Sequence, residues 1–104
     1  IKSLFISQAT SWNSQIDNEI KNYHWSTYRH PNRYSEESLD EAMEKMNDVL
    51  RKICLQYNSQ FIDMSKIIPK SKEYYYDDYH FNINGVLFFS KEVSRFIINN
   101  ILAN

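Results

Sequence analysis

Asp77 and His80 are the residues of this chain best suited to acid–base chemistry. They stand three positions apart in the stretch DDYHFNING, residues 77–85. A carboxylate at this spacing can fold back in a tight loop and accept a hydrogen bond from the histidine Nδ1–H. Nε2 then faces outward as a base, with its tautomer fixed and its imidazolium form stabilised. Asp78 can also reach the ring, so the choice of partner stays open. On spacing alone, a loop ion pair without a catalytic role is the commoner outcome.

The other reactive side chains are few and scattered. His24 and His30 lie in an aromatic, polar segment without a carboxylate at ligand spacing, and Cys54 is the only cysteine. A zinc site needs several such ligands in close groups, so no metal site and no cofactor are expected. Cys54 is expected to be an inert core residue. Asp63, near a predicted strand end, is expected to cap or to bond nearby backbone amides.

Composition and charge narrow the classes of partner. Of the 104 residues, 42% are hydrophobic and 15% aromatic, which is enough apolar mass for the core of one domain. The net charge is −1 and the 12 Lys and Arg residues are scattered, which argues against a nucleic-acid or anionic-membrane surface. No apolar run approaches the ~20 residues of a membrane helix. We therefore expect no nucleic-acid partner and no membrane span.

The spacing of apolar residues divides the chain into strands and helices that would position the stretch at 77–85. The predicted segments are a strand at 1–7, a short helix within 10–25, a loop at 26–33, a long amphipathic helix at 35–57, a strand at 60–64, a connector at 65–76 and a second amphipathic helix at 84–102. Ser35 or Ser38 can cap the long helix, and Asn82 or Asn84 the last one.

A strand, a long helix and a second strand make a βαβ unit, which implies parallel pairing. The predicted fold class is therefore α/β: the C-terminal β-α-β-α part of a three-layer α/β/α, flavodoxin-like parallel sheet. Two strands are too few for an independent sheet of this kind. Residues 1–104 are thus expected to form one partial domain, with further strands supplied by upstream sequence or a partner chain. A first residue that is Ile and a single glycine, Gly85, suggest a piece of a longer chain, although removal of a tag or leader is an alternative.

The order of these features resembles the C-terminal portion of the SGNH (GDSL-type) hydrolases. The features are the run FIDM at 61–64, Pro69, the block Asp77-x-x-His80-Phe81-Asn82-x-x-Gly85 and the amphipathic helix after it. The resemblance implies an ester hydrolase with an acyl-serine mechanism and no metal, acting on an acylated carbohydrate or a lipid. It also implies that His80 is the general base and that Asp77 orients it.

The residues that would complete such a site are not in this sequence. In that family the nucleophile lies in a Gly-Asp-Ser block, and further oxyanion donors are a glycine and an asparagine in middle blocks. This sequence has no Gly-Asp-Ser and no Gly-x-Asn-Asp. The nucleophile and the oxyanion hole are therefore expected to lie outside this chain, which alone should be inactive. The alternative is a non-catalytic α/β interaction module that lacks the nucleophile.

Two further interpretations concern surfaces. Aromatic residues after the first strand could bind a carbohydrate or acyl group, or simply pack; they are Trp12, Tyr23, Trp25 and Tyr28. The tyrosines at 74–76 could line a substrate cleft or pack the connector, and packing is expected of them. Open sheet edges and apolar helix faces also predict self-association of the chain. Localisation cannot be read from these residues.

Overall fold

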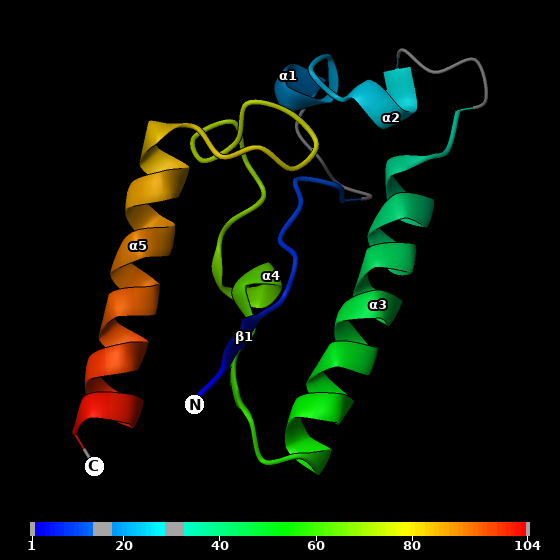
Figure 1. The fold of residues 1–104 in the computed structure, drawn as a ribbon. Helices are drawn as coiled ribbons and strands as arrows, with labels where there is room; N and C mark the ends of the chain where they lie inside the picture. The colour runs from blue at the N-terminus through cyan, green and yellow to red at the C-terminus, as the bar shows by residue number, and fades with distance from the viewer. Residues whose placement is uncertain (1, 14–17, 29–32, 104) are drawn as a thin grey trace.

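The structure, a computed structural model, describes residues 2–13, 18–28 and 33–103. Its elements, in chain order, are β1 (Leu4–Ile6), α1 (Asn18–Lys21), α2 (Trp25–Tyr28), α3 (Glu36–Gln56), β2 (Gln60–Ile62), α4 (Met64–Ile67), α5 (Ile83–Ile97) and the π-helix η1 (Ile98–Leu102). Helices therefore make up most of the described chain. The two long helices, α3 and α5, lie on either side of the strands in Figure 1.

The strands β1 and β2 form the two-stranded parallel sheet of the described chain, with Phe5 opposite Phe61. This confirms the predicted parallel pairing across α3. The predicted fold class, a three-layer α/β/α, flavodoxin-like parallel sheet, is nevertheless wrong. Each strand has three residues, because within the described chain the two strands pair only with each other and no further strand extends them. Two strands of that length cannot build a sheet layer, and the apolar residues of the chain lie mainly in helices.

Helix α3 begins and ends where its sequence predicts. The Ser35 hydroxyl accepts a hydrogen bond from the Ser38 N–H at 3.1 Å, which makes Ser35 the N-cap. Glu36 and Glu37 occupy the first turn, where negative charge suits the helix dipole. At the other end Asn58 adopts a left-handed conformation, with φ of 51°, and the Ser59 N–H closes the turn on a carbonyl of the last helical residues. The chain then enters β2 directly.

The segments around α1, α2 and α4 correct the predictions in part. Helix α1 lies inside the predicted helix at 10–25, but α2 occupies positions 25–28, of which three were expected to be loop. The rest of that loop, at 29–32, lies outside the described residues. Helix α4 replaces the end of the second strand and the start of the connector. All three helices have four residues, which is too short for a clear apolar periodicity.

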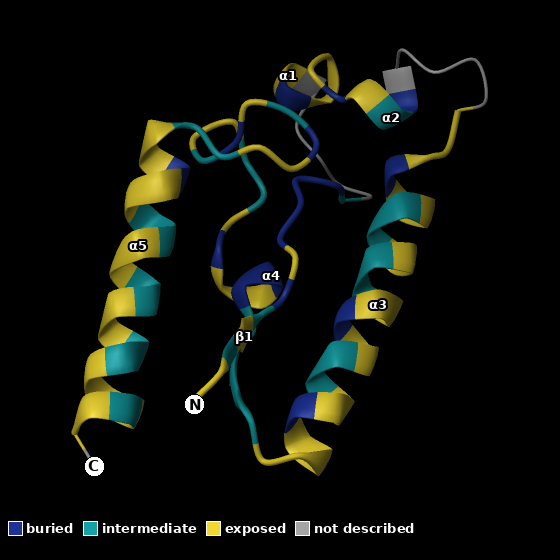
Figure 2. Ribbon diagram, in the orientation of Figure 1, coloured by how far each residue is buried: buried dark blue, intermediate teal, exposed yellow. Residues whose placement is uncertain are grey.

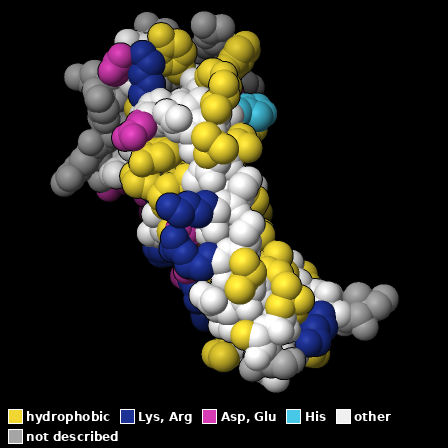
Figure 3. Space-filling view, turned by 90° about the vertical axis from the view of Figure 1, so that its left-hand side faces the viewer, with side chains coloured by type: hydrophobic (Ala, Val, Ile, Leu, Met, Phe, Trp, Pro, Cys, Tyr) yellow, Lys and Arg dark blue, Asp and Glu magenta, His cyan; other side chains and the backbone are white. Residues whose placement is uncertain are grey.

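The core lies between the strands and α5. Its buried apolar residues are Ala9, Ile20, Ile62, Met64, Ile68 and Tyr75, and partly buried aromatic and aliphatic residues of α5 pack against them. Figure 2 shows this buried centre and the exposed outer faces of the long helices. Several large apolar side chains stay open to solvent on these helices, among them Met46, Val49, Leu55, Val86 and Leu87. Figure 3, from the α5 side, shows hydrophobic side chains lying uncovered on that face.

Within the described residues, the helices are too short or too polar to cross a bilayer. The expectation that the chain has no membrane span agrees with this.

Candidate functional site

Asp77 and His80 meet as their spacing predicts. Nδ1 of His80 lies 2.8 Å from Asp77 Oδ2 and 3.0 Å from Oδ1. The His80 side chain is 65% exposed and the Asp77 side chain 18% exposed, so the ring stands in solvent against a partly buried carboxylate. A carboxylate at Nδ1 favours the tautomer that carries its proton there. Nε2 is then the unprotonated, outward-facing nitrogen.

The Asp77 carboxylate is held from the backbone side as well. Its Oδ1 accepts hydrogen bonds from the N–H groups of Tyr79 at 3.1 Å and His80 at 2.9 Å. Partial burial raises the pKa of the Asp77 carboxyl, but the hydrogen bonds from the His80 main chain and ring and from Tyr79 outweigh it. The net effect is a pKa below the usual value. Asp77 therefore stays ionised beside the ring at neutral pH.

Asp78 turns to the interior, which settles the choice that the sequence leaves open. It is fully buried, and its Oδ2 accepts from the Ser26 N–H at 2.9 Å and from Trp12 Nε1–H at 3.2 Å. Its Oδ1 accepts from the Trp25 N–H. Asp78 thus holds the first turn of α2 and does not contact His80. This distant cap explains why α2 forms where local sequence predicts a loop.

The loop that carries the pair is closed by main-chain contacts and by Asn82. The Tyr76 N–H donates to the His80 carbonyl at 2.8 Å. The Asn82 side chain accepts from the Gly85 N–H at 3.0 Å, as N-cap of α5, and donates to the Lys72 and Glu73 carbonyls. The expectation that Asn82 or Asn84 caps α5 is thereby resolved in favour of Asn82.

Gly85 is required by a close approach of two chain segments. A Cβ at this position would lie 2.1 Å from the Tyr74 carbonyl oxygen and 2.9 Å from Phe81 Cβ. Only glycine lets the first turn of α5 pack so tightly on the connector. The block from Asp77 to Gly85 is therefore one tightly folded unit.

Aromatic rings lie beside His80. The Tyr79 and His80 ring centroids are 4.6 Å apart, and the Tyr79 ring meets Trp12 edge-on at 6.5 Å. Trp12 is buried and Tyr79 is about half exposed. Of the tyrosines at 74–76, which were expected to pack, Tyr75 is buried against Phe81 and Tyr74 packs edge-on against Phe88, whereas Tyr76 is largely exposed. Burial raises the pKa of the Tyr75 phenol.

Sequence reasoning missed a buried polar chain behind the loop. Ser11 and His24 are fully buried, and the Ser11 Oγ lies 2.8 Å from His24 Nε2. On the other side of the ring, His24 Nδ1 lies 3.6 Å from Glu36 Oε1. No carboxylate stands at ligand spacing from His24 in the sequence, but α3 brings the distant Glu36 to it in the fold. No local spacing could reveal this, since the partners come from three separate segments. His30 lies outside the described residues.

A second polar cluster joins the carboxyl ends of the strands. The Asp63 carboxylate accepts from the hydroxyls of Ser7 and Ser65, each at 2.9 Å, and pairs with Arg51. Burial raises the pKa of the Asp63 carboxyl, but these hydrogen bonds and the Arg51 charge outweigh that effect. The net result is a pKa below the usual value. Asp63 occupies the N-cap position of α4, as one of the two expectations had it, but its side chain makes no capping hydrogen bond and contacts side chains instead of backbone amides. Cys54 is a buried free thiol in α3, as expected.

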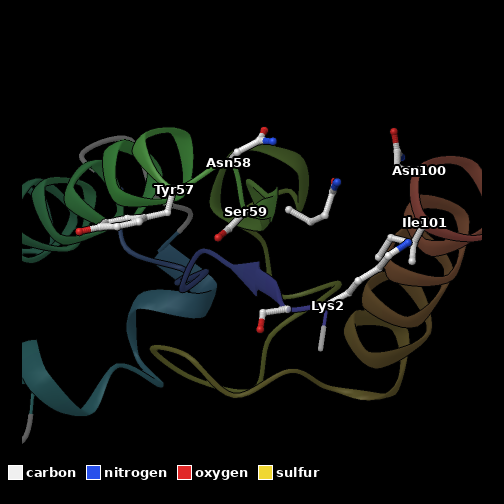
Figure 4. A pocket seen from close by; sticks show the side chains of 8 residues that line it. Lys2, Tyr57, Asn58, Ser59, Asn100 and Ile101 are labelled. Carbon is white, nitrogen blue, oxygen red and sulfur yellow. The ribbon is translucent and has the colours of Figure 1, made fainter. Parts of the chain in front are cut away.

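A pocket of about 430 Å³ lies away from the candidate site. It opens between the end of α3, the residues on either side of the strand starts and η1. Figure 4 shows its labelled side chains: Lys2, Tyr57, Asn58, Ser59, Asn100 and Ile101. It lies at the amino ends of the strands, opposite the ends that carry Ser7 and Asp63. Within the described residues, no three metal-ligating side chains gather at one point.

Comparison with protein-family models, with curated proteins and with solved structures finds no match for this chain.

Proposed function

We propose that Asp77 and His80 are the orienting carboxylate and the general base of a serine ester hydrolase of the SGNH type. In this proposal the chain supplies the Asp-His half of the catalytic triad. The observation that carries it is the 2.8 Å contact between His80 Nδ1 and Asp77 Oδ2 in a ring whose side chain is 65% exposed. The exposed ring leaves His80 accessible to a serine carried by another part of the protein.

The geometry suits proton transfer at Nε2. With Nδ1–H donated to Asp77, the Nε2 lone pair takes the proton of a serine hydroxyl as the serine oxygen attacks the ester carbonyl carbon. The protonated ring then gives that proton to the leaving alkoxide, and an acyl-serine remains. Water releases the acyl group with the same base. The ionised Asp77 stabilises the positive ring in both steps, which fits the lowered pKa of its carboxyl.

The serine and the oxyanion donors must come from other residues. Ser11 is the serine bonded to the loop, but its Oγ contacts the Asp77 carbonyl and His24 and is buried. A further part of the protein that carries the serine would cover the exposed apolar side chains of α3 and α5. The substrate class is an ester, on an acylated carbohydrate or a lipid. This chain alone is expected to be inactive, since the strongest catalytic contribution usually comes from the oxyanion donors.

The test is made on the chain joined to whatever sequence its gene encodes upstream of Ile1. Hydrolysis of a small aryl acetate is measured for the unaltered protein, for His80→Ala and for Glu41→Gln, an exposed ion-pair carboxylate on α3 that serves as a control. We expect His80→Ala to lose at least about 10³-fold in kcat/KM. The Glu41→Gln variant should keep its activity. Near-normal turnover in His80→Ala would contradict the proposal.

The rival proposal is a non-catalytic interaction module. The observation in its favour is the uncovered apolar surface, which includes Leu55 at 83% and Leu102 at 72% exposed. Under this proposal, and also for a partial enzyme domain, the isolated chain self-associates through these faces. Light scattering should then show oligomers whose mass rises with concentration. A monodisperse monomer with cooperative unfolding would contradict self-association, and a Gly-Asp-Ser block encoded upstream would favour the enzyme.

A further inference from the structure

Ser11, a buried serine, forms hydrogen bonds with the main chain of the candidate site. The Ser11 Oγ lies 2.8 Å from the Asp77 carbonyl oxygen and 3.3 Å from that of Asp78. The Ser11 N–H donates to the Asp78 carbonyl at 2.8 Å. Ser11 is fully buried. One residue from the segment after β1 therefore holds both peptide units that carry the two carboxylates.

The single hydrogen of the Ser11 hydroxyl can be donated either to the Asp77 carbonyl or to His24 Nε2. A serine hydroxyl has one hydrogen to donate. If Ser11 gives it to the Asp77 carbonyl, then the contact of 2.8 Å with His24 Nε2 requires that Nε2 be the donor. If Ser11 gives it to Nε2, the Asp77 carbonyl loses this donor. The proton on His24 thus decides whether the hydroxyl holds the loop.

Both 2.8 Å contacts of the Ser11 hydroxyl are satisfied only when His24 carries a proton on Nε2. Its ring is fully buried, and the charged groups that face the cluster are Glu36 of α3, Lys21 at 3.9 Å from Glu36, and the Asp78 carboxylate beside α2. His24 Nδ1 and Glu36 Oε1 stand 3.6 Å apart, and each has no hydrogen-bond partner among the described residues. A proton on Nδ1 would lie beyond hydrogen-bond distance of Glu36 and would leave the Asp77 carbonyl without its Ser11 donor. A proton on Nε2, donated to Ser11, satisfies both short contacts.

We propose that Ser11 and His24 are positioning residues for the Asp77–His80 pair, with His24 Nε2–H donating to Ser11 and Ser11 donating to the Asp77 carbonyl. Their role in catalysis rests on the proposed function, whereas the hydrogen-bond chain itself does not. Ser11 and His24 touch neither the substrate nor the reacting atoms. They fix the backbone from which the Asp77 carboxylate reaches His80. Without them, the carboxylate no longer selects the Nδ1–H tautomer of His80.

The test is the tautomer of each histidine, read from two-bond ¹⁵N–¹H NMR correlations of the 104-residue chain. In the unaltered chain we expect His24 protonated at Nε2, with slow exchange, and neutral His80 protonated at Nδ1. Finding His24 Nε2 unprotonated would overturn the proposal without any variant. Ser11→Ala should lower the Nδ1–H population of His80 by at least about two-fold, since the ring then samples both tautomers.

Matched variants separate positioning from loss of structure. His24→Gln keeps an N–H donor near the position of Nε2 and should preserve the His80 tautomer, whereas His24→Leu should not. Ser65→Ala removes a different buried serine hydroxyl, which donates to the Asp63 carboxylate and not to the loop, and should leave the His80 tautomer unchanged. An equal tautomer change in Ser65→Ala and Ser11→Ala would overturn the inference. An unchanged His80 tautomer in folded Ser11→Ala would do so as well.

The outcomes also separate this inference from the proposed function. If hydrolysis depends on His80 but the His80 tautomer is unchanged by Ser11→Ala, the positioning role alone is overturned. A tautomer that responds as expected, in a longer protein without His80-dependent hydrolysis, supports the hydrogen-bond chain and overturns the enzyme proposal alone.

Discussion

Asp77 and Asp78 are neighbours in the chain, yet their carboxylates face opposite environments. The Asp77 carboxylate contacts the exposed His80 ring, while the Asp78 carboxylate is fully buried and accepts hydrogen bonds from Trp12 and the first turn of α2. One side chain is available for chemistry and the other holds the loop to the body of the molecule. This division yields separate predictions for the two residues.

Removal of the Asp78 carboxylate should destabilise the fold. It accepts three hydrogen bonds in a buried setting, and Asp78→Ala leaves their donors without a partner. We expect a loss of about 2–4 kcal/mol in the free energy of unfolding. Urea unfolding measures it. Asp48→Ala, which changes an exposed carboxylate on α3, should shift the free energy by less than about 1 kcal/mol; equal losses would argue against the buried role of Asp78.

Gly85→Ala should destabilise the packing of α5 on the connector that carries the site. The new Cβ would lie 2.1 Å from the Tyr74 carbonyl oxygen, so the connector or α5 must shift. We expect a cost of about 2–4 kcal/mol in unfolding free energy. Ser94→Ala, at an exposed position on the same helix, is the control and should be close to neutral. Unchanged stability in Gly85→Ala would mean that the tight packing at Tyr74 is absent in solution.

Loss of the α5 cap should cost more than loss of the α3 cap. Asn82 accepts from the Gly85 N–H and also donates to two connector carbonyls, whereas Ser35 caps α3 at an exposed position. Ser35→Ala should cost about 1 kcal/mol, and Asn82→Ala about 2–3 kcal/mol. Thermal or urea unfolding of the two variants compares them. The reverse order would show that the contacts to Lys72 and Glu73 contribute little.

Acid should weaken the fold through Asp63 and Asp77. The pKa of each carboxyl in the folded chain lies below the ordinary value of 3.8. A lowered folded pKa contributes stability that is present above pH 3.8 and is lost as the pH falls through the folded pKa. The urea concentration at the unfolding midpoint should therefore decrease as the pH is lowered below about 4. Asp63→Asn should reduce this dependence of the midpoint on pH. If the midpoint of that variant changed with pH as steeply as that of the unaltered chain, Asp63 would not contribute to the acid sensitivity.

Sequence patterns predicted the features that depend on near neighbours. The steps of three and four along α3, a serine cap at its start and the approach of Asp77 to His80 are all set within a few positions of the chain. The sequence offered Ser35 or Ser38 as that cap, and the structure selects Ser35. The parallel pairing of β1 and β2 also followed from the order of elements. Local spacing carries this information because helix turns and tight loops repeat over three or four residues.

Features that depend on distant segments were not predictable in the same way. The strands are shorter than expected, since pairing with further strands would be needed to extend them, and the expected three-layer sheet is absent from the described chain. The cap on α2 comes from Asp78, and the partner of His24 comes from α3. Asn47 of α3 likewise bonds the Gln8 main chain in both directions. Nothing in the local sequence indicates which remote group will fill such a position.

A double-mutant comparison tests most directly whether Asp77 acts through His80 in ester hydrolysis. Aryl acetate turnover is measured in the chain joined to its upstream sequence, for Asp77→Asn, His80→Ala and the two changes together. We predict a loss of at least about 10³-fold for His80→Ala, a clear loss for Asp77→Asn, and no further loss when Asp77→Asn is added to His80→Ala. Turnover that survives His80→Ala, or losses that simply multiply, would contradict the assignment of the pair as one catalytic unit.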